Sequence, residues 1–243
     1  MKKINAVYVS LVALVVAIAA LVMCILCCNK GSNVEEALNN NPEMIINAMQ
    51  KYEVMQREKA MKEMEELMAS SAEDLYNNAN DGVVGNAEGK VALVEFFDFS
   101  CGYCHRIYPV LKNVVAKNAD LKLVVKPLAF LSPMSKYAAK AALAAKEQGK
   151  FAEVYSAIFE IKGQLTEAKI DEAVVLAGVD LEKLKTDMES EKVKKTMEDT
   201  AALAGKLRIN GVPTLVLNGK IIQTLDDGQL LRTACAGKAA GFV

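Results

Sequence analysis

Hydrophobic and polar positions divide the chain into an apolar N-terminal segment, a long charged helix and a mixed α/β region. Residues 6–28 are apolar except for Tyr8 and Ser10, which is enough length for a helix that spans a bilayer. Residues 29–41 form a polar linker. From Met44 to about Tyr76, apolar residues recur at helical spacing among charged ones, which predicts an amphipathic helix. Its apolar positions are Ile45, Met49, Tyr52, Met55, Met61, Met64, Met68 and Leu75.

The N-terminal segment bears on the location of the protein. Lys2 and Lys3 precede the apolar run, so we expect the N-terminus to stay inside and the rest to be exported. An uncleaved anchor is the first interpretation. A signal peptide cleaved after Ala17-Ile18-Ala19 and a lipoprotein are the alternatives, although Met23, Leu26 and Cys27 are poor residues to precede a lipid-modified Cys. We therefore expect a periplasmic protein held at the inner membrane, or a soluble periplasmic or outer-membrane form.

The remaining residues, 80–243, alternate strand and helix patterns. Val91–Phe97 and 121–125 are apolar runs typical of buried strands, and 211–222 reads as a hairpin that turns at Asn218-Gly219. Helical patterns cover the residues between the second strand and the hairpin, and a last helix is expected over about 227–238. The expected helices are 132–148, 151–161, 167–177, 180–189 and 191–206.

The first of these strands leads directly into Cys101-Gly102-Tyr103-Cys104, and a helical pattern follows the second cysteine. A strand followed by Cys-x-x-Cys and a helix places Cys101 at a helix N-terminus. Free backbone N–H groups and the positive end of the helix dipole stabilise a thiolate there, and the thiolate is the form that attacks disulfides. The pattern therefore predicts a redox-active pair.

The remaining cysteines and the composition bear on which other kinds of site and partner the chain could have. Cys24 and Cys27 repeat the spacing, but an apolar segment makes sulfur inert, so we interpret them and Cys28 as small apolar residues, and Cys235 as a buried thiol. With 29 basic and 30 acidic residues and no basic block, nucleic acid is not an expected partner. A single histidine argues against a His-based metal site, and no metal or other cofactor is expected.

The order of these elements resembles the thioredoxin fold, and the helical insertion, at about residues 131–190, resembles the DsbA-like branch of exported thiol–disulfide oxidoreductases. The expected fold class is thus α/β, a thioredoxin fold with a helical insertion. The expected domains are an anchor or signal segment (1–28), a linker and helical stalk (29–79) and a DsbA-like domain (80–243). The stalk resembles that of the ScsC-like and surface-antigen members, and we expect it to form a homo-oligomer through residues 44–76.

The resemblance implies a role for several residues. Cys101 is the exposed nucleophile that forms mixed disulfides, and Cys104 resolves them. Glu95, six residues before Cys101, matches a partly buried acid that passes protons to Cys104; an exposed edge position is the alternative. Val212-Pro213 matches a pair with a cis bond beside the active site, where a substrate strand binds; a trans turn proline is the alternative. Gly102, Tyr103 and Thr214 are expected to contact substrate.

His105 is left with two interpretations: a cation that stabilises thiolate, or a helix-surface residue without a role. The implied partners are cysteine-containing exported proteins and a membrane redox partner, either a quinone-linked oxidase or a thiol reductase. Disulfide formation and isomerisation are both open. The competing functions are a non-catalytic stalked adhesin, c-type haem attachment through Cys-x-x-Cys-His, and, weakest, a zinc site.

Overall fold

The computed structural model describes residues 6–28 and 38–222 of the chain. It divides into two compact units, Met1–Met61 and Lys62–Val243. The helix expected over about 227–238, with Cys235, lies outside the described residues.

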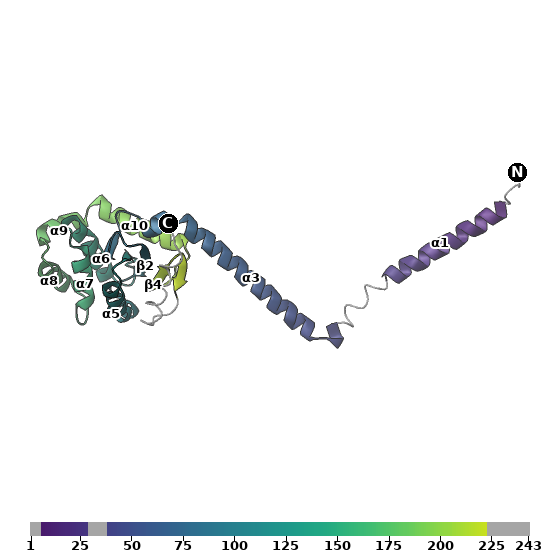
Figure 1. Cartoon of the computed structure of the whole chain (residues 1–243), viewed down its shortest axis with the longest axis horizontal. Coiled ribbons are helices and arrows are strands. Elements are labelled where there is room, and N and C mark those ends of the chain that lie inside the picture. The colour runs from purple at the N-terminus through teal and green to yellow at the C-terminus, as the bar shows by residue number, and fades with distance from the viewer. Residues whose placement is uncertain (1–5, 29–37, 223–243) are drawn as a thin grey trace. The chain divides into compact units, whose positions relative to one another are not determined.

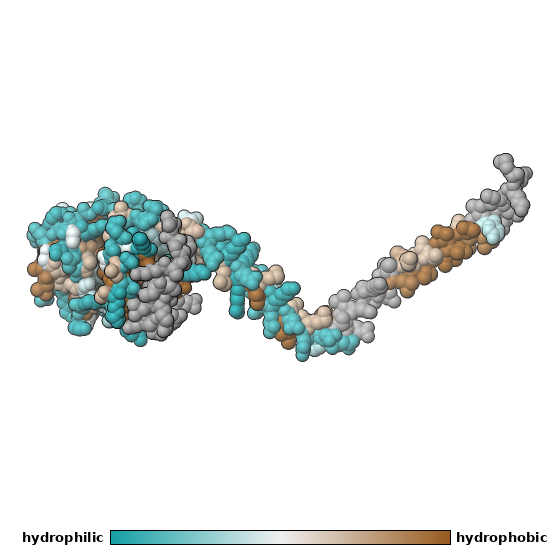
Figure 2. All heavy atoms as spheres, viewed as in Figure 1, coloured by the Kyte–Doolittle hydropathy of each residue, from teal (hydrophilic) through white to brown (hydrophobic). Residues whose placement is uncertain are grey.

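The first unit contains α1 (Ala6–Cys28) and most of α3 (Glu43–Ser70). Apolar side chains are exposed along α1, as Figure 2 shows. In the part of the chain that the structure describes, no helix has both the length and the hydropathy that crossing a membrane requires. The predicted membrane anchor is therefore not confirmed.

Apolar residues of α3 in the first unit are also exposed, among them Ile45, Met49 and Tyr52. At about 100° per residue these three share one side of the helix, whereas Val54 and Met61 lie on the other side. The apolar positions therefore do not form the single stripe that the spacing indicates.

In the second unit, the end of α3 and the short α4 (Ala72–Tyr76) belong to the folded domain. The expected single helix is interrupted at Ser71. Met68 of α3 and Leu75 of α4 are fully buried in one hydrophobic core, and the Tyr76 hydroxyl accepts a hydrogen bond from the Gly219 N–H at 2.9 Å. These contacts attach α4 to one face of the sheet and to its hairpin turn.

The strands described within the second unit form a five-stranded sheet in the order β1-β3-β2-β4-β5. β2 pairs in parallel with β3, and the other pairs are antiparallel. The strands are β1 (Gly82–Gly85), β2 (Val91–Phe97), β3 (Leu121–Pro127), β4 (Thr214–Leu217) and β5 (Lys220–Ile222). β2, which ends four residues before Cys101, is therefore the central strand of this sheet.

Side chains alternate between the two faces of β2, so each face has its own core. Leu93 and Phe97 lie in the larger core with α5 (Gly102–Lys117), whereas Val94 and Phe96 pack with Met68 and Leu75. Figure 1 shows the sheet strands β2 and β4 between α5 and α10 (Glu191–Lys206).

Helices connect β3 to β4, as expected, and they continue to Lys206, beyond the range of about 131–190 that the sequence analysis gives for the insertion. Four of its helices begin at a side chain that accepts a backbone N–H three residues later: Ser132, Thr166, Asp180 and Ser190. These caps explain why the sequence locates the starts of the helices so closely. The helices are α6 (Pro133–Ala145), the 3₁₀ turn η2 (Lys146–Gln148), α7 (Phe151–Glu160), α8 (Glu167–Leu176), α9 (Leu181–Met188) and α10 (Glu191–Lys206).

Candidate active site

Cys101 is the N-cap of α5 and follows the end of β2 after a short turn, Asp98–Ser100. The Cys104 N–H donates a hydrogen bond to the Cys101 sulfur at 3.3 Å. A donor at a helix N-terminus stabilises negative charge on that sulfur. The residue is only 6% exposed, so Cys101 is less exposed than the sequence analysis expects.

Cys104 lies one turn inside the helix and is fully buried. Both cysteines are free thiols. Burial raises the pKa of the Cys104 thiol, and the nearby Glu95 carboxylate and Cys101 raise it further. Cys104 is therefore the less accessible member and is held as a protonated thiol.

The segment before β4 lies against Cys101. The Val212–Pro213 peptide bond is cis, and the trans alternative is wrong. The Cys101 thiol donates to the Val212 carbonyl at 3.5 Å, and the Thr214 hydroxyl donates to the Gly211 carbonyl at 2.7 Å. Val212 is 111 residues away from Cys101 along the chain, yet the structure brings the two into contact. Its neighbours Pro213 and Thr214 thus also lie near Cys101, where the sequence analysis expects them.

Glu95 is fully buried in β2, so the alternative of an exposed edge residue is wrong. Burial raises the pKa of its carboxyl group to about 7, and a hydrogen bond from the Tyr155 hydroxyl opposes that rise. The Tyr155 oxygen lies 2.8 Å from Glu95 Oε2. A carboxyl group that titrates near neutrality is suited to accept or donate a proton.

His105 is half-buried, and its Nε2 lies 2.7 Å from the Phe99 carbonyl oxygen. Because a carbonyl can only accept, Nε2 must carry the hydrogen. The ring meets Phe159 edge-on at 5.1 Å. His105 therefore ties the start of α5 to the turn before the cysteines, and its role towards the thiolate stays a prediction.

The turn between β2 and Cys101 is fixed by groups that the sequence analysis missed. Asp98 is fully buried; one carboxylate oxygen accepts the Ser100 N–H at 2.7 Å and the other accepts the Leu131 N–H at 3.0 Å. The Ser100, Ser132 and Ser135 hydroxyls lie 2.8–3.0 Å from one another. An Asp directly after a strand is a turn signal that could have indicated the first of these contacts.

Exposed apolar side chains surround this turn. Tyr103 is 60% exposed, and the Arg106 guanidinium lies 4.1 Å from its ring centre. Phe130 and Leu131, after β3, are about half exposed. Gly102 has open space around its Cβ position, so it leaves the approach to Cys101 uncrowded. Such a rim is suited to contact a polypeptide.

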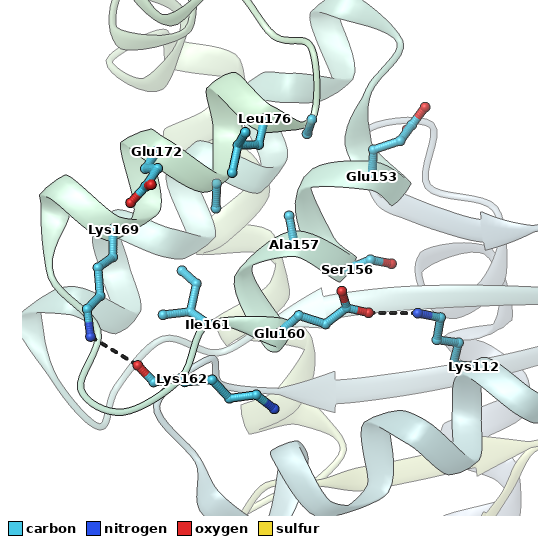
Figure 3. Close-up of a pocket in the computed structure, with 12 residues that line it drawn as sticks. Lys112, Glu153, Ser156, Ala157, Glu160, Ile161, Lys162, Lys169, Glu172 and Leu176 are labelled. Atoms are coloured by element: carbon cyan, nitrogen blue, oxygen red, sulfur yellow. Dashed lines mark hydrogen bonds and ion pairs between the residues drawn. The ribbon is translucent and has the colours of Figure 1, made fainter.

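A hollow of about 590 Å³ lies beside α7, between α5 and α8 (Figure 3). At its α5 side, Lys112 donates to Glu160 Oε1 at 2.7 Å, and the Tyr108 hydroxyl donates to the same oxygen at 3.1 Å. The two bonds join α5, the helix that begins at Cys101, to the end of α7 in the insertion. Within the described residues, no group of three or more potential metal ligands is present.

The fold and the paired cysteines define a thioredoxin-fold protein with a dithiol at the end of a central strand. Residues 92–236 match the DSBA-like thioredoxin domain, and the chain belongs to that family.

The chain is also similar to individual known proteins. The chain is 33% identical over 164 residues to Na(+)/H(+) antiporter NhaA 1 of Mycolicibacterium gilvum, covering 65% of this chain and 27% of that protein. It spans about a quarter of the length of such curated relatives. A thioredoxin-like oxidoreductase from Silicibacter pomeroyi is 32% identical with a TM-score of 0.65, covering 70% of this chain and 98% of that one. A linker-deletion mutant of Proteus mirabilis ScsC is 25% identical with a TM-score of 0.69, covering 86% and 93%.

Proposed function

We propose that this protein is a thiol:disulfide oxidoreductase that acts on protein cysteines through Cys101 and Cys104. The observation that carries the proposal is the asymmetry of the pair. Cys101 sits at a helix N-terminus with a donor to its sulfur, whereas Cys104 is buried one turn inside. The family and the oxidoreductase from Silicibacter pomeroyi support the same activity.

The substrate is proposed to lie along the segment Gly211–Pro213. Pro213 has no N–H, and this segment precedes the paired part of β4, so an extended chain can bind there with its cysteine at Cys101. The rim of Tyr103, Phe130 and Leu131 adds apolar contact. Unfolded polypeptides, which expose cysteines and apolar side chains together, fit this surface.

The geometry disfavours haem attachment. That chemistry needs both sulfurs within reach of the haem vinyl groups, whereas Cys104 is fully buried, and His105 Nε2 is engaged by Phe99. A non-catalytic adhesin is the remaining alternative, and it requires no exchange of thiols at all.

Disulfide exchange suits an oxidising compartment, and Lys2-Lys3 before the apolar segment is the pattern of an export signal, so we propose a periplasmic location. Attachment to a membrane through residues 6–28 and a membrane redox partner stay predictions. Formation and isomerisation of disulfides are distinguished by the reduction potential of the pair: a strong oxidant donates its disulfide, and a more reducing pair stays reduced for isomerisation.

The first prediction tests the roles of the two cysteines. Cys101→Ser abolishes exchange with oxidised glutathione, because the attacking sulfur is gone. Cys104→Ser accumulates a mixed disulfide between Cys101 and glutathione, because nothing resolves it. Mass spectrometry of acid-quenched, alkylated protein measures both outcomes.

Cys24→Ser is the matched control, since Cys24 is a free thiol of α1 outside the site, and it leaves exchange unchanged. Glutathione on Cys104 in the Cys101→Ser variant would reverse the roles. No exchange by the unchanged protein would remove the proposed activity and favour the adhesin.

A further inference from the structure

Tyr155 is a buried phenol that comes from the helical insertion rather than from the thioredoxin elements. It lies on α7, and its hydroxyl donates to Glu95 Oε2, 60 residues away on β2. The ring packs in an aromatic cluster, with ring centres 5.4 Å from Phe97 and 5.0 Å from Phe159. The position of the hydroxyl is therefore fixed by packing on several sides.

The two carboxyl oxygens of Glu95 are not equivalent. Oε2 holds the Tyr155 bond, whereas Oε1 is buried and has no hydrogen-bond partner among the described residues. An unsatisfied buried oxygen is costly, and where it persists it often marks a functional position. The carboxylate is close enough to Cys104 to raise the pKa of that thiol.

Few titratable groups act on Glu95. α7 contributes Tyr155 and α5 contributes Cys104, while the register neighbours in β3 and β4 are the apolar Val125 and Leu215. Cys101 acts on Cys104, and Tyr108 of α5 acts on Tyr155. The charge of Glu95 therefore responds mainly to Tyr155 and to the dithiol.

We propose that Tyr155 is a positioning residue, which holds Glu95 by Oε2 so that Oε1 is presented to the Cys104 sulfur as its proton acceptor. The inference rests on the proposed dithiol exchange and deepens it.

The step concerns the resolution of a mixed disulfide. The Cys104 thiol gives its proton to Glu95 Oε1, and its sulfur attacks the Cys101 sulfur. The Cys104–Cys101 S–S bond forms, the bond between Cys101 and the substrate sulfur breaks, and the substrate leaves as a thiolate. In the reverse direction, Cys104 leaves as a thiolate and takes the proton back from Glu95.

The hydroxyl also sets the pH range of this step. Burial raises the pKa of Glu95 to about 7, and the Tyr155 bond restrains the rise because it stabilises the charged form. Without that bond the pKa of Glu95 is higher, and less carboxylate is present at neutral pH to accept the proton.

The chain offers a matched pair of variants. Tyr155→Phe removes only the hydroxyl and keeps the ring contacts. Tyr108→Phe removes a hydroxyl from the same aromatic cluster, but one that donates to Glu160 at the rim of the hollow in Figure 3. A general effect of deleting a phenol oxygen would appear in both variants, and an effect through Glu95 only in the first.

The experiment uses the full chain with oxidised glutathione, and follows conversion of the mixed disulfide to the Cys101–Cys104 disulfide by acid quench and mass spectrometry across pH. The expected rate rises with pH through an inflection near 7. Tyr155→Phe moves the inflection up by about one unit and slows the step about fivefold at pH 7, because one hydrogen bond to a charged group is lost. Tyr108→Phe leaves the inflection in place, and Glu95→Gln removes it.

A second measurement is independent of exchange: the Glu95 carboxyl is titrated by ¹³C NMR in the reduced protein, and its midpoint rises in Tyr155→Phe. An unchanged midpoint and inflection in that variant would overturn the role of Tyr155 while the proposed function stands. Absence of any mixed disulfide in the unchanged protein would instead overturn the proposed function.

Discussion

At the scale of single residues, the sequence predicts the positions of those site residues that are defined by the strand or helix next to them in the chain. Cys101 follows a strand and precedes a helix, and Val212-Pro213 precedes the hairpin, so their places in the fold follow from neighbouring residues. Tyr155 could not be found in this way. The apolar face of α7 indicates that the ring is buried and that its hydroxyl needs an acceptor, but the acceptor is 60 residues away.

Glu95 also affects the stability of the fold. The pKa of the Glu95 carboxyl group is about 7 in the folded state and near 4.5 in the unfolded state, so folding favours the protonated form. Its contribution to the free energy of unfolding is therefore fully present below pH 4.5, and it is lost as the pH rises through about 7. We therefore expect Glu95→Gln to stabilise the reduced protein at pH 8 by about 3 kcal/mol, and to change its stability little at pH 4.

Urea unfolding of both proteins at pH 4 and pH 8 measures this difference. The glutamine oxygen can still accept the Tyr155 hydrogen bond, so the substitution removes the charge and keeps the contact. An equal effect at the two pH values would mean that burial does not raise the pKa of Glu95.

At the scale of elements, a buried ion pair joins β3 to the turn before β1. Lys126 is buried, pairs with the buried Asp81, and donates to the Asp74 carbonyl of α4 at 2.7 Å. Burial raises the pKa of Asp81, and the lysine opposes the rise. A lysine in a strand that is otherwise buried is a signal that the sequence carries, but its partners on α4 and in the turn come from tertiary packing.

Removing Lys126 leaves the buried Asp81 carboxylate without its ion-pair partner. Lys126→Met is expected to lower the free energy of unfolding by about 3–5 kcal/mol, as for other buried pairs that lose a partner. Thermal or urea unfolding of the reduced protein measures the loss.

Lys112→Met is the matched control. It makes the same substitution in the Lys112–Glu160 ion pair, in which both side chains are more than half exposed. Only a small change in the free energy of unfolding is expected for this variant. Equal losses in the two variants would show that the burial of Lys126 adds nothing to its contribution.

The elements themselves were predicted to within a few residues where a polar side chain caps the helix, as Ser190 caps α10. The interruption of the long helix at Ser71 was not predicted, because charged and apolar residues continue at helical spacing across it. Met68 and Leu75, which lie on either side of the interruption, both pack against the sheet.

At the scale of the whole molecule, the exposed apolar residues of α3 stay without a described partner. Burying such side chains is favourable by roughly 25 cal/mol per Å². We therefore predict that the chain forms a homo-oligomer through α3, in which Ile45, Met49 and Tyr52, on one side of the helix, lie in the interface.

Light scattering on residues 29–243 measures the mass. Ile45→Glu with Met49→Glu is expected to give a monomer, because two charges enter the interface. Asn47→Glu with Gln50→Glu adds the same charge on the other side of the helix and keeps the oligomer. A monomeric parent protein would contradict the prediction.

The hydrogen bond between the Tyr76 hydroxyl and the Gly219 N–H has a mechanical consequence. When the chain is pulled at Lys62, the load passes along the end of α3 into α4, and from α4 through Met68, Leu75 and this bond to the sheet and the β4–β5 turn. β4 begins one residue after Pro213, beside Cys101. We therefore expect tension on the N-terminal side to load β4, the strand whose first residue follows Pro213.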